Sequence, residues 1–100
     1  MTTAMKLLEK KVGPVTVGML LRAHRTRNDL SQLELAQILN ATVGFISNIE
    51  TGKKHISLEK TLDIAKKIGS SKEFFASIWF QEEARINGLS FEKIIKAKSA

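Results

Sequence analysis

Few side chains in this sequence have the types and the spacing that catalysis requires. The chain has no cysteine and only two histidines, His24 and His55, and neither has a second metal ligand at a matching spacing. No phosphate-binding loop is recognisable, and the scattered serines do not form a nucleophile–base–carboxylate set. We therefore expect a protein that is not an enzyme and that uses neither a cofactor nor a metal.

The polar side chains with informative spacing lie in one stretch, from Ser31 to Gly52. Ser31 precedes an apolar run, and Glu34 follows it three residues later, which is the pattern of a helix-capping box. Leu35 and Leu39 then recur at i and i+4, so that both lie on one side of a helix. The pattern predicts a short helix from Gln32 to Leu39.

A second short helix is predicted directly after the first. Asn40 tolerates the left-handed backbone of a tight turn, and Thr42 can cap a helix over about 43–51. Gly52 is a natural stop for that helix. Two helices so short and so tightly joined describe a helix-turn-helix, whose second helix can enter the major groove of DNA.

Two segments within this stretch carry a family resemblance. Ser-Gln-x-x-Leu-Ala at 31–36 and Ile-Ser-x-Ile-Glu-x-Gly-Lys at 46–53 resemble the Cro/C1-type (XRE-like) helix-turn-helix family of phage and bacterial regulators. The resemblance extends from about Val17 to Gly69. It implies an all-α fold: a compact, lambda-repressor-like domain of about five helices, with one or two extra helices at the C-terminal end.

The resemblance also implies that double-stranded DNA is the partner and indicates which positions contact it. These positions are Gln32, Thr42, Val43, Gly44, Phe45, Ser47 and Asn48. The loop that follows, Lys53, Lys54 and His55, is basic and suits phosphate contact. In the family, a buried pair often joins the residues that match Arg25 and Glu50, and we expect the same pair here.

The side chains at the reading positions are unusual for direct recognition of bases. Asn48 is the one side chain there that can hydrogen-bond adenine bidentately, and Ser47 can serve a phosphate or a base. Val43 can only touch a thymine methyl, while Gly44 has no side chain and permits close backbone approach. We therefore expect modest direct readout, with DNA shape or a paired subunit supplying further specificity.

The net charge of the chain favours a polyanionic partner such as DNA. The 100-residue chain has a net charge of +6, and the excess lies before residue 31 and within 57–72, on either side of the helix-turn-helix. No apolar run approaches a membrane span and no signal peptide is recognisable, so we expect a cytoplasmic protein. We divide the chain into a partly ordered N-terminal arm (1–13), the helix-turn-helix domain (14–69) and a C-terminal helical extension (70–100).

The extension is rich in aromatic and aliphatic side chains, and three roles for them remain open. We expect one helix to begin with a capping box from Ser70 to Glu73, and Ser90 to cap a last short helix. The apolar side chains can add to the core, form a homodimer interface, or bind a protein partner such as a toxin or another regulator. The candidate interface residues are Phe74, Phe75, Ile78, Trp79, Phe91, Ile94 and Ile95. Two functions follow: a dimeric repressor, or an antitoxin-type or accessory subunit.

Overall fold

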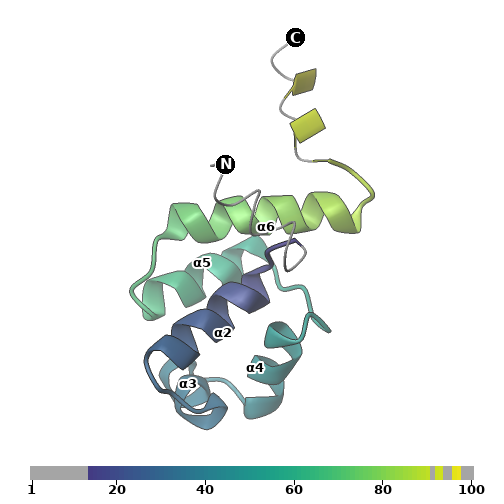
Figure 1. The fold of residues 1–100 in the computed structure, drawn as a ribbon. Helices are drawn as coiled ribbons and strands as arrows, with labels where there is room; N and C mark the ends of the chain where they lie inside the picture. Colours follow the sequence, from purple (N-terminus) through teal and green to yellow (C-terminus); the bar gives the residue numbers. More distant parts are fainter. Residues whose placement is uncertain (1–13, 91, 94–95, 98–100) are drawn as a thin grey trace.

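The computed structural model describes residues 14–90, 92–93 and 96–97 of the chain (Figure 1). Within these residues it contains helices and no strand, which confirms the expected all-α fold. The helices are α2 (Val17–Arg27), α3 (Gln32–Leu39), α4 (Val43–Glu50), α5 (Leu58–Lys67) and α6 (Lys72–Ile86). The predicted N-terminal arm, and Phe91, Ile94 and Ile95 of the predicted last helix, lie outside the described residues. None of the described helices is long and apolar enough to cross a membrane.

Each of these helices begins at a serine or threonine hydroxyl that accepts a backbone N–H of the first turn. The capping residues are Thr16, Ser31, Thr42, Ser57 and Ser71. The predicted capping box of α3 is confirmed: the Ser31 hydroxyl accepts from the Glu34 N–H at 3.0 Å, and the Ser31 N–H donates to the Glu34 carboxylate at 2.9 Å. The pKa of Glu34 is lowered mainly by the hydrogen bond from the Ser31 backbone N–H and to a smaller extent by one with the Ser31 hydroxyl. Their contribution to stability is therefore present above the unfolded pKa of Glu34 and is lost as pH falls through the folded pKa.

The connection between α3 and α4 has the backbone that the sequence indicates. Asn40 adopts the left-handed conformation (φ 53°) and ends α3, and Thr42 caps α4. The expected start of α6 is wrong by one residue, because Ser71 and not Ser70 is the cap. The Ser70 N–H donates instead to the Ala65 carbonyl at 2.8 Å, so Ser70 belongs to the C-terminal closure of α5.

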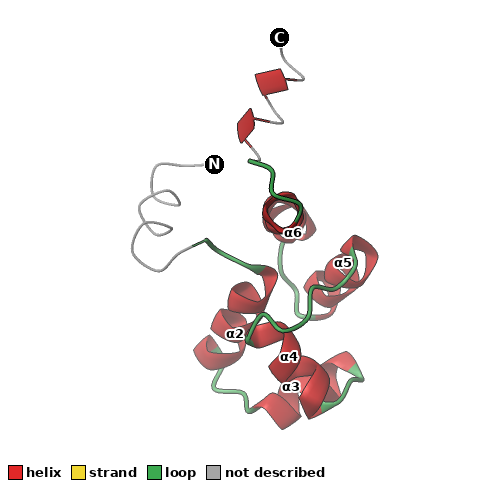
Figure 2. Ribbon diagram, turned by 90° about the vertical axis from the view of Figure 1, so that its right-hand side faces the viewer, coloured by secondary structure: helices red, strands yellow, loops and turns green. Residues whose placement is uncertain are grey.

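The helices are arranged with the helix-turn-helix at one end of the molecule and α6 at the other. Figure 1 shows α6 lying across α2 and α5, with α3 and α4 at the opposite end. Figure 2, turned by 90°, shows the same order, with α6 seen end-on beyond α2 and α5. The helix pair that is expected to meet DNA is therefore directed away from α6.

Two clusters of buried side chains hold this arrangement together. The first joins α3 and α4 to α2 and α5 and consists of Leu21, Leu35, Ala36, Leu39, Ile46, Ile49, Ile56 and Ile64. The second joins α6 to α5 and to the start of α2, and consists of Val15, Val17, Ala65, Phe75 and Ile78. Since Phe75 and Ile78 are 3% and 0% exposed, their assignment to a dimer or partner interface is wrong, and they belong to the core.

The contact between α2 and the end of α4 depends on a glycine. A Cβ atom added at Gly18 would lie 1.9 Å from the Ile49 carbonyl oxygen and 3.2 Å from the Glu50 Cα. These are backbone atoms, which cannot rotate away as a flexible side chain could. Gly18 therefore lets α2 approach the last turn of α4 at backbone distance.

Substitution of Gly18 tests this close approach. We expect Gly18→Ala to lower the free energy of unfolding by about 3 kcal/mol, because the two helices must separate to admit one methyl group. Gly44→Ala is the matched control, since the nearest atom to its added Cβ is the Thr42 hydroxyl at 4.0 Å. That variant should be as stable as the parent or about 0.5 kcal/mol more stable. Urea unfolding of both variants measures the difference, and equal stabilities would contradict the account.

Candidate nucleic-acid interface

The outward side of α4 presents small and polar groups that make no hydrogen bonds with other described side chains. Val43, Gly44 and Asn48 are exposed, and Ser47 is half-buried. Within the described residues, neither the Asn48 amide nor the Ser47 hydroxyl has a hydrogen-bond partner, so both groups are available to a ligand. The opposite side of α4, with Ile46 and Ile49, is buried as expected. We call Val43, Gly44, Ser47 and Asn48 the exposed arc of α4.

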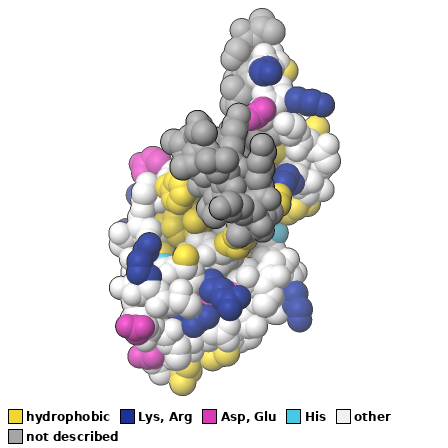
Figure 3. All heavy atoms as spheres, viewed as in Figure 1, with side chains coloured by type: hydrophobic (Ala, Val, Ile, Leu, Met, Phe, Trp, Pro, Cys, Tyr) yellow, Lys and Arg dark blue, Asp and Glu magenta, His cyan; other side chains and the backbone are white. Residues whose placement is uncertain are grey.

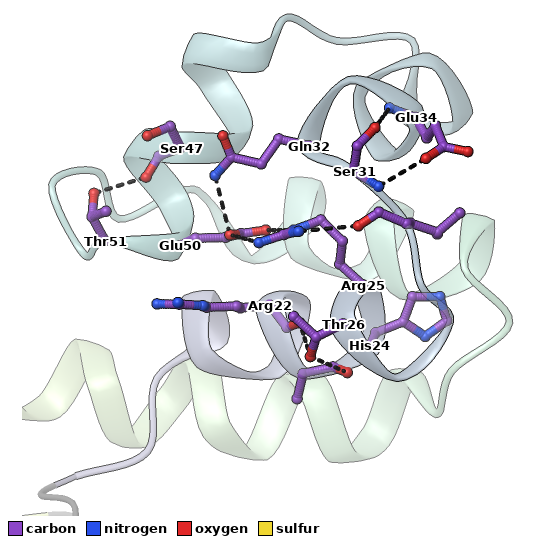
Figure 4. A network of polar contacts seen from close by, with 12 residues as sticks. Arg22, His24, Arg25, Thr26, Ser31, Gln32, Glu34, Ser47, Glu50 and Thr51 are labelled. Atoms are coloured by element: carbon purple, nitrogen blue, oxygen red, sulfur yellow. Dashed lines mark hydrogen bonds and ion pairs between the residues drawn. The ribbon is translucent and has the colours of Figure 1, made fainter.

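The last residue of α4 is held by a bidentate ion pair with α2 (Figure 4). Arg25 Nε donates to Glu50 Oε2 at 2.8 Å, and Arg25 Nη2 donates to Glu50 Oε1 at 3.0 Å. The remaining guanidinium nitrogen, Nη1, donates to the Leu30 carbonyl at 3.0 Å. The hydrogen bond with Glu50 raises the pKa of Arg25, which is charged at any ordinary pH. The pair that the family resemblance implied is thus present and joins α2, the α2–α3 turn and α4.

The ion pair is buried, and α3 contributes to it through Gln32. The Glu50 side chain is 3% exposed and the Arg25 side chain 15%. Gln32 Nε2 donates to Glu50 Oε1 at 3.3 Å, so this predicted DNA contact also has an internal partner. A carboxylate removed from water to this extent needs its partners, because an unpaired buried charge is strongly destabilising. The pair therefore fixes the end of α4 relative to the first turn of α3.

Arg22 is a basic side chain beside this network that the sequence analysis did not single out. Figure 4 shows Arg22 and Arg25 projecting side by side from α2 toward the end of α4. Arg22 is exposed, and its guanidinium forms no ion pair or hydrogen bond with another described residue. Its spacing of three residues from Arg25 is the signal that could have found it, because residues at i and i+3 share one side of a helix.

The loop after α4 does not present its three basic residues in the same way. Lys53 and Lys54 are exposed, but His55 is half-buried and turned toward α6. His55 Nε2 lies 2.6 Å from a Glu83 oxygen, and its Nδ1 lies 3.5 Å from a Glu82 oxygen. The His55 ring also stacks on Trp79, with 5.3 Å between the ring centres. The expected contact of His55 with DNA is therefore wrong, because the ring is engaged within the protein.

The same part of α6 also binds the backbone on both sides of the helix-turn-helix. The half-buried Trp79 donates from Nε1 to the Ile56 carbonyl at 2.7 Å, which ties this side chain to the loop after α4. Glu82 accepts the Val17 N–H at 3.0 Å, and Arg85 donates to the Val15 carbonyl at 3.0 Å. α6 thus fixes both the start of α2 and the loop that follows α4.

Phe45 is also more internal than the other predicted contacts on α4. It is half-buried and packs against the first cluster of buried side chains. The ammonium groups of Lys54 and Lys60 lie 5.4 and 5.6 Å from the centre of its ring. Phe45 therefore contacts the protein core and two lysines, and it stands at the edge of the exposed arc.

Charged and apolar side chains are unevenly distributed over the face seen in Figure 3. Figure 3 shows Lys and Arg side chains in the lower middle of this face and at its edges, and hydrophobic atoms exposed both at the upper left and at the end formed by α3 and α4. The large exposed apolar residues of that end are Leu33 (56%), Ile38 (49%) and Val43 (39%). The described residues contain no group of three His, Cys, Asp or Glu side chains that could hold a metal ion.

The family of the chain follows from a comparison of its sequence with family models. The model described as helix-turn-helix matches residues 21–75, more than half of the chain and all of α3, α4 and α5. The chain belongs to the Cro/C1-type helix-turn-helix family. A search of curated proteins finds no match to the chain.

Membership of this Cro/C1-type family identifies the matched segment, which contains α3 and α4, as a DNA-binding regulatory domain. The match ends at residue 75, within α6. Trp79, Glu82, Glu83 and Arg85, which bind the loop after α4 and the start of α2, therefore lie beyond the matched segment. The contacts that position α2, α4 and the loop after α4 thus come partly from the family domain and partly from the helix in which the match ends.

Removal of one partner tests the buried ion pair. We expect Arg25→Met or Glu50→Met to lower the free energy of unfolding by about 3–5 kcal/mol, because each leaves a charge buried without its counterpart. The double variant should lose much less than the sum of the two, since it leaves no orphaned charge. Lys67→Met breaks the exposed Lys67–Asp63 pair, in which both side chains are at least 40% exposed, and should cost less than about 1 kcal/mol. Additive losses in the double variant, measured by urea unfolding, would contradict this account.

Proposed function

We propose that this protein is a sequence-specific, double-stranded DNA-binding transcriptional regulator that places α4 in the major groove. The observation that carries the proposal is the exposed arc of α4, whose polar groups are free while the end of the helix is fixed by the Arg25–Glu50 pair. A reading helix needs both properties, because its side chains must be available to bases and its direction must be set before binding.

The chemistry of the arc supports a division between base contacts and phosphate contacts. Asn48 is the side chain suited to a bidentate contact with adenine, while Val43 offers a methyl surface for thymine. Lys53 and Arg22 are exposed cations without an ion-pair partner among the described residues, and they suit phosphates near the C-terminal end of α4. Gln32 lies at the amino end of α3, where a phosphate is favoured by the helix dipole.

We further propose that the protein acts as a homodimer and as a repressor. One reading helix with a single bidentate side chain specifies few base pairs, and a second subunit doubles that number. On α6, Phe74, Phe80 and Ile86 are exposed. They are six residues apart, so successive side chains are separated by about 120° around the helix axis and form no continuous stripe. Ile86 and Leu89, 60% and 54% exposed, instead lead into the predicted apolar stripe of the last helix, which is the segment we propose for dimerisation.

Selection of bound sequences from random duplexes tests this function. We expect a palindrome whose half-sites are about one helical turn, roughly 34 Å, apart. A single asymmetric site would contradict the homodimer while leaving DNA recognition in place. Binding that is weak and blind to sequence would contradict the regulator and favour the alternative, an antitoxin-type or accessory subunit that binds a protein partner.

Two variants separate base readout from phosphate contact on the selected duplex. Asn48→Ala should cost about 1–3 kcal/mol on the selected sequence and little on one altered at the contacted adenine, because the amide contact is specific. Lys53→Ala should weaken binding to both duplexes alike and reduce the salt slope by about 1. Fluorescence anisotropy at several salt concentrations measures both effects. If the two variants act equally on every sequence, the readout by Asn48 is wrong.

A further inference from the structure

One aromatic ring lies close to two lysines that come from different elements. The Lys54 ammonium, from the loop after α4, lies 5.4 Å from the Phe45 ring centre, and the Lys60 ammonium, from the first turn of α5, lies 5.6 Å from it. Both distances are within the range of a cation–π interaction. Phe45 is itself held by the core that it packs against, so it is a fixed support for two flexible side chains.

This pair of lysines borders the exposed arc on one side. Successive helical residues are turned by about 100°, so Phe45 lies about 60° from Asn48 around the axis of α4. The other edge of the arc, at Val43 and Ser47, is directed toward Glu50 and the start of α3. A helix lying in the major groove is flanked by the phosphates of two strands, and Lys54 and Lys60 stand on the Asn48 flank.

Of the two lysines, Lys54 has no carboxylate partner among the described residues, and Lys60 has only a long ion pair with Asp63. Asp63 lies 4.0 Å from the Lys60 ammonium but 3.1 Å from that of Lys67, so Lys67 is its nearer partner. Glu59 is an exposed carboxylate in the same turn of α5, and no ion pair joins it to Lys60. Lys54 pairs with no carboxylate among the described residues.

We propose that Phe45 is a positioning residue that holds Lys54 and Lys60 for the phosphates of one DNA strand beside the reading helix. This inference rests on the proposed function and adds a residue, Lys60, and a role, that of Phe45. A lysine contact with phosphate ordinarily requires a long side chain to lose its freedom on binding. The ring reduces that loss, because it limits the freedom of both side chains before DNA arrives.

The test measures affinity for a duplex of random sequence across about 50–200 mM salt, where each lost phosphate contact lowers the slope of log K against log salt by about 0.9. Lys54→Ala and Lys60→Ala should each lower the slope by this amount, and the double variant by about twice as much. Lys66→Ala is the matched control, because Lys66 is an exposed lysine of the same helix that lies about 120° around the helix axis from Lys60. Its slope should equal that of the parent chain.

The role of Phe45 is tested by coupling, which a purely structural residue would not produce. In a Phe45→Leu background, the fold-loss of affinity on Lys60→Ala should shrink at least twofold, whereas Phe45→Tyr, which keeps the ring, should retain the full loss. An unchanged fold-loss in Phe45→Leu would overturn the positioning role, and an unchanged slope in Lys60→Ala would overturn the contact. A parent chain that binds no duplex would overturn the proposed function and this inference together.

Discussion

The buried Arg25–Glu50 ion pair is the interaction on which the orientation of α4 depends. It joins the last residue of α4 to α2 by two short hydrogen bonds, and its remaining contacts reach Leu30 and Gln32. A pair so thoroughly removed from water contributes little net stability, yet it does not tolerate the loss of either member. Its consequence is geometric, because three elements must meet correctly for every donor and acceptor to be satisfied.

Gly18 and α6 complete the constraint that the ion pair begins. Gly18 brings the backbone of α2 against Ile49, one residue before Glu50, so the last turn of α4 is held by a close backbone contact and by charge. α6 then fixes the start of α2 and the loop after α4 through Val17 and Ile56. α4 is thus held at its buried side and at its end, while the side chains of the exposed arc make no hydrogen bonds with other described residues. A rigid support with a free polar surface is what recognition of another molecule requires.

The parts of the fold that local patterns determine could be predicted from the sequence. The capping box at Ser31, the left-handed turn at Asn40 and the cap at Thr42 each depend on residues within a few positions of one another. The start of α6 cannot be placed to the residue in this way, because the adjacent Ser70 and Ser71 offer the same cap. Only the closure of α5 onto Ser70 decides between them.

Contacts between distant segments could not be predicted in this way. In the sequence His55 belongs to a basic loop, but its partners Glu82 and Glu83 lie in the part of α6 that follows the family match. Phe75 and Ile78 are of residue types that occur both in cores and in partner interfaces. Only the position of α6 on α2 and α5 shows that they are buried. Residue type and helical spacing give the side of a helix that is apolar, and tertiary packing decides what covers it.

Amide chemical-shift mapping during titration with a duplex would show directly which surface binds DNA. We expect the largest changes at the amino end of α3, along the exposed arc of α4 and at Lys53 and Lys54, with the amides of α6 little affected. Changes concentrated in α6 and in the residues after it, with the arc unperturbed, would contradict the placement of the DNA interface on α4.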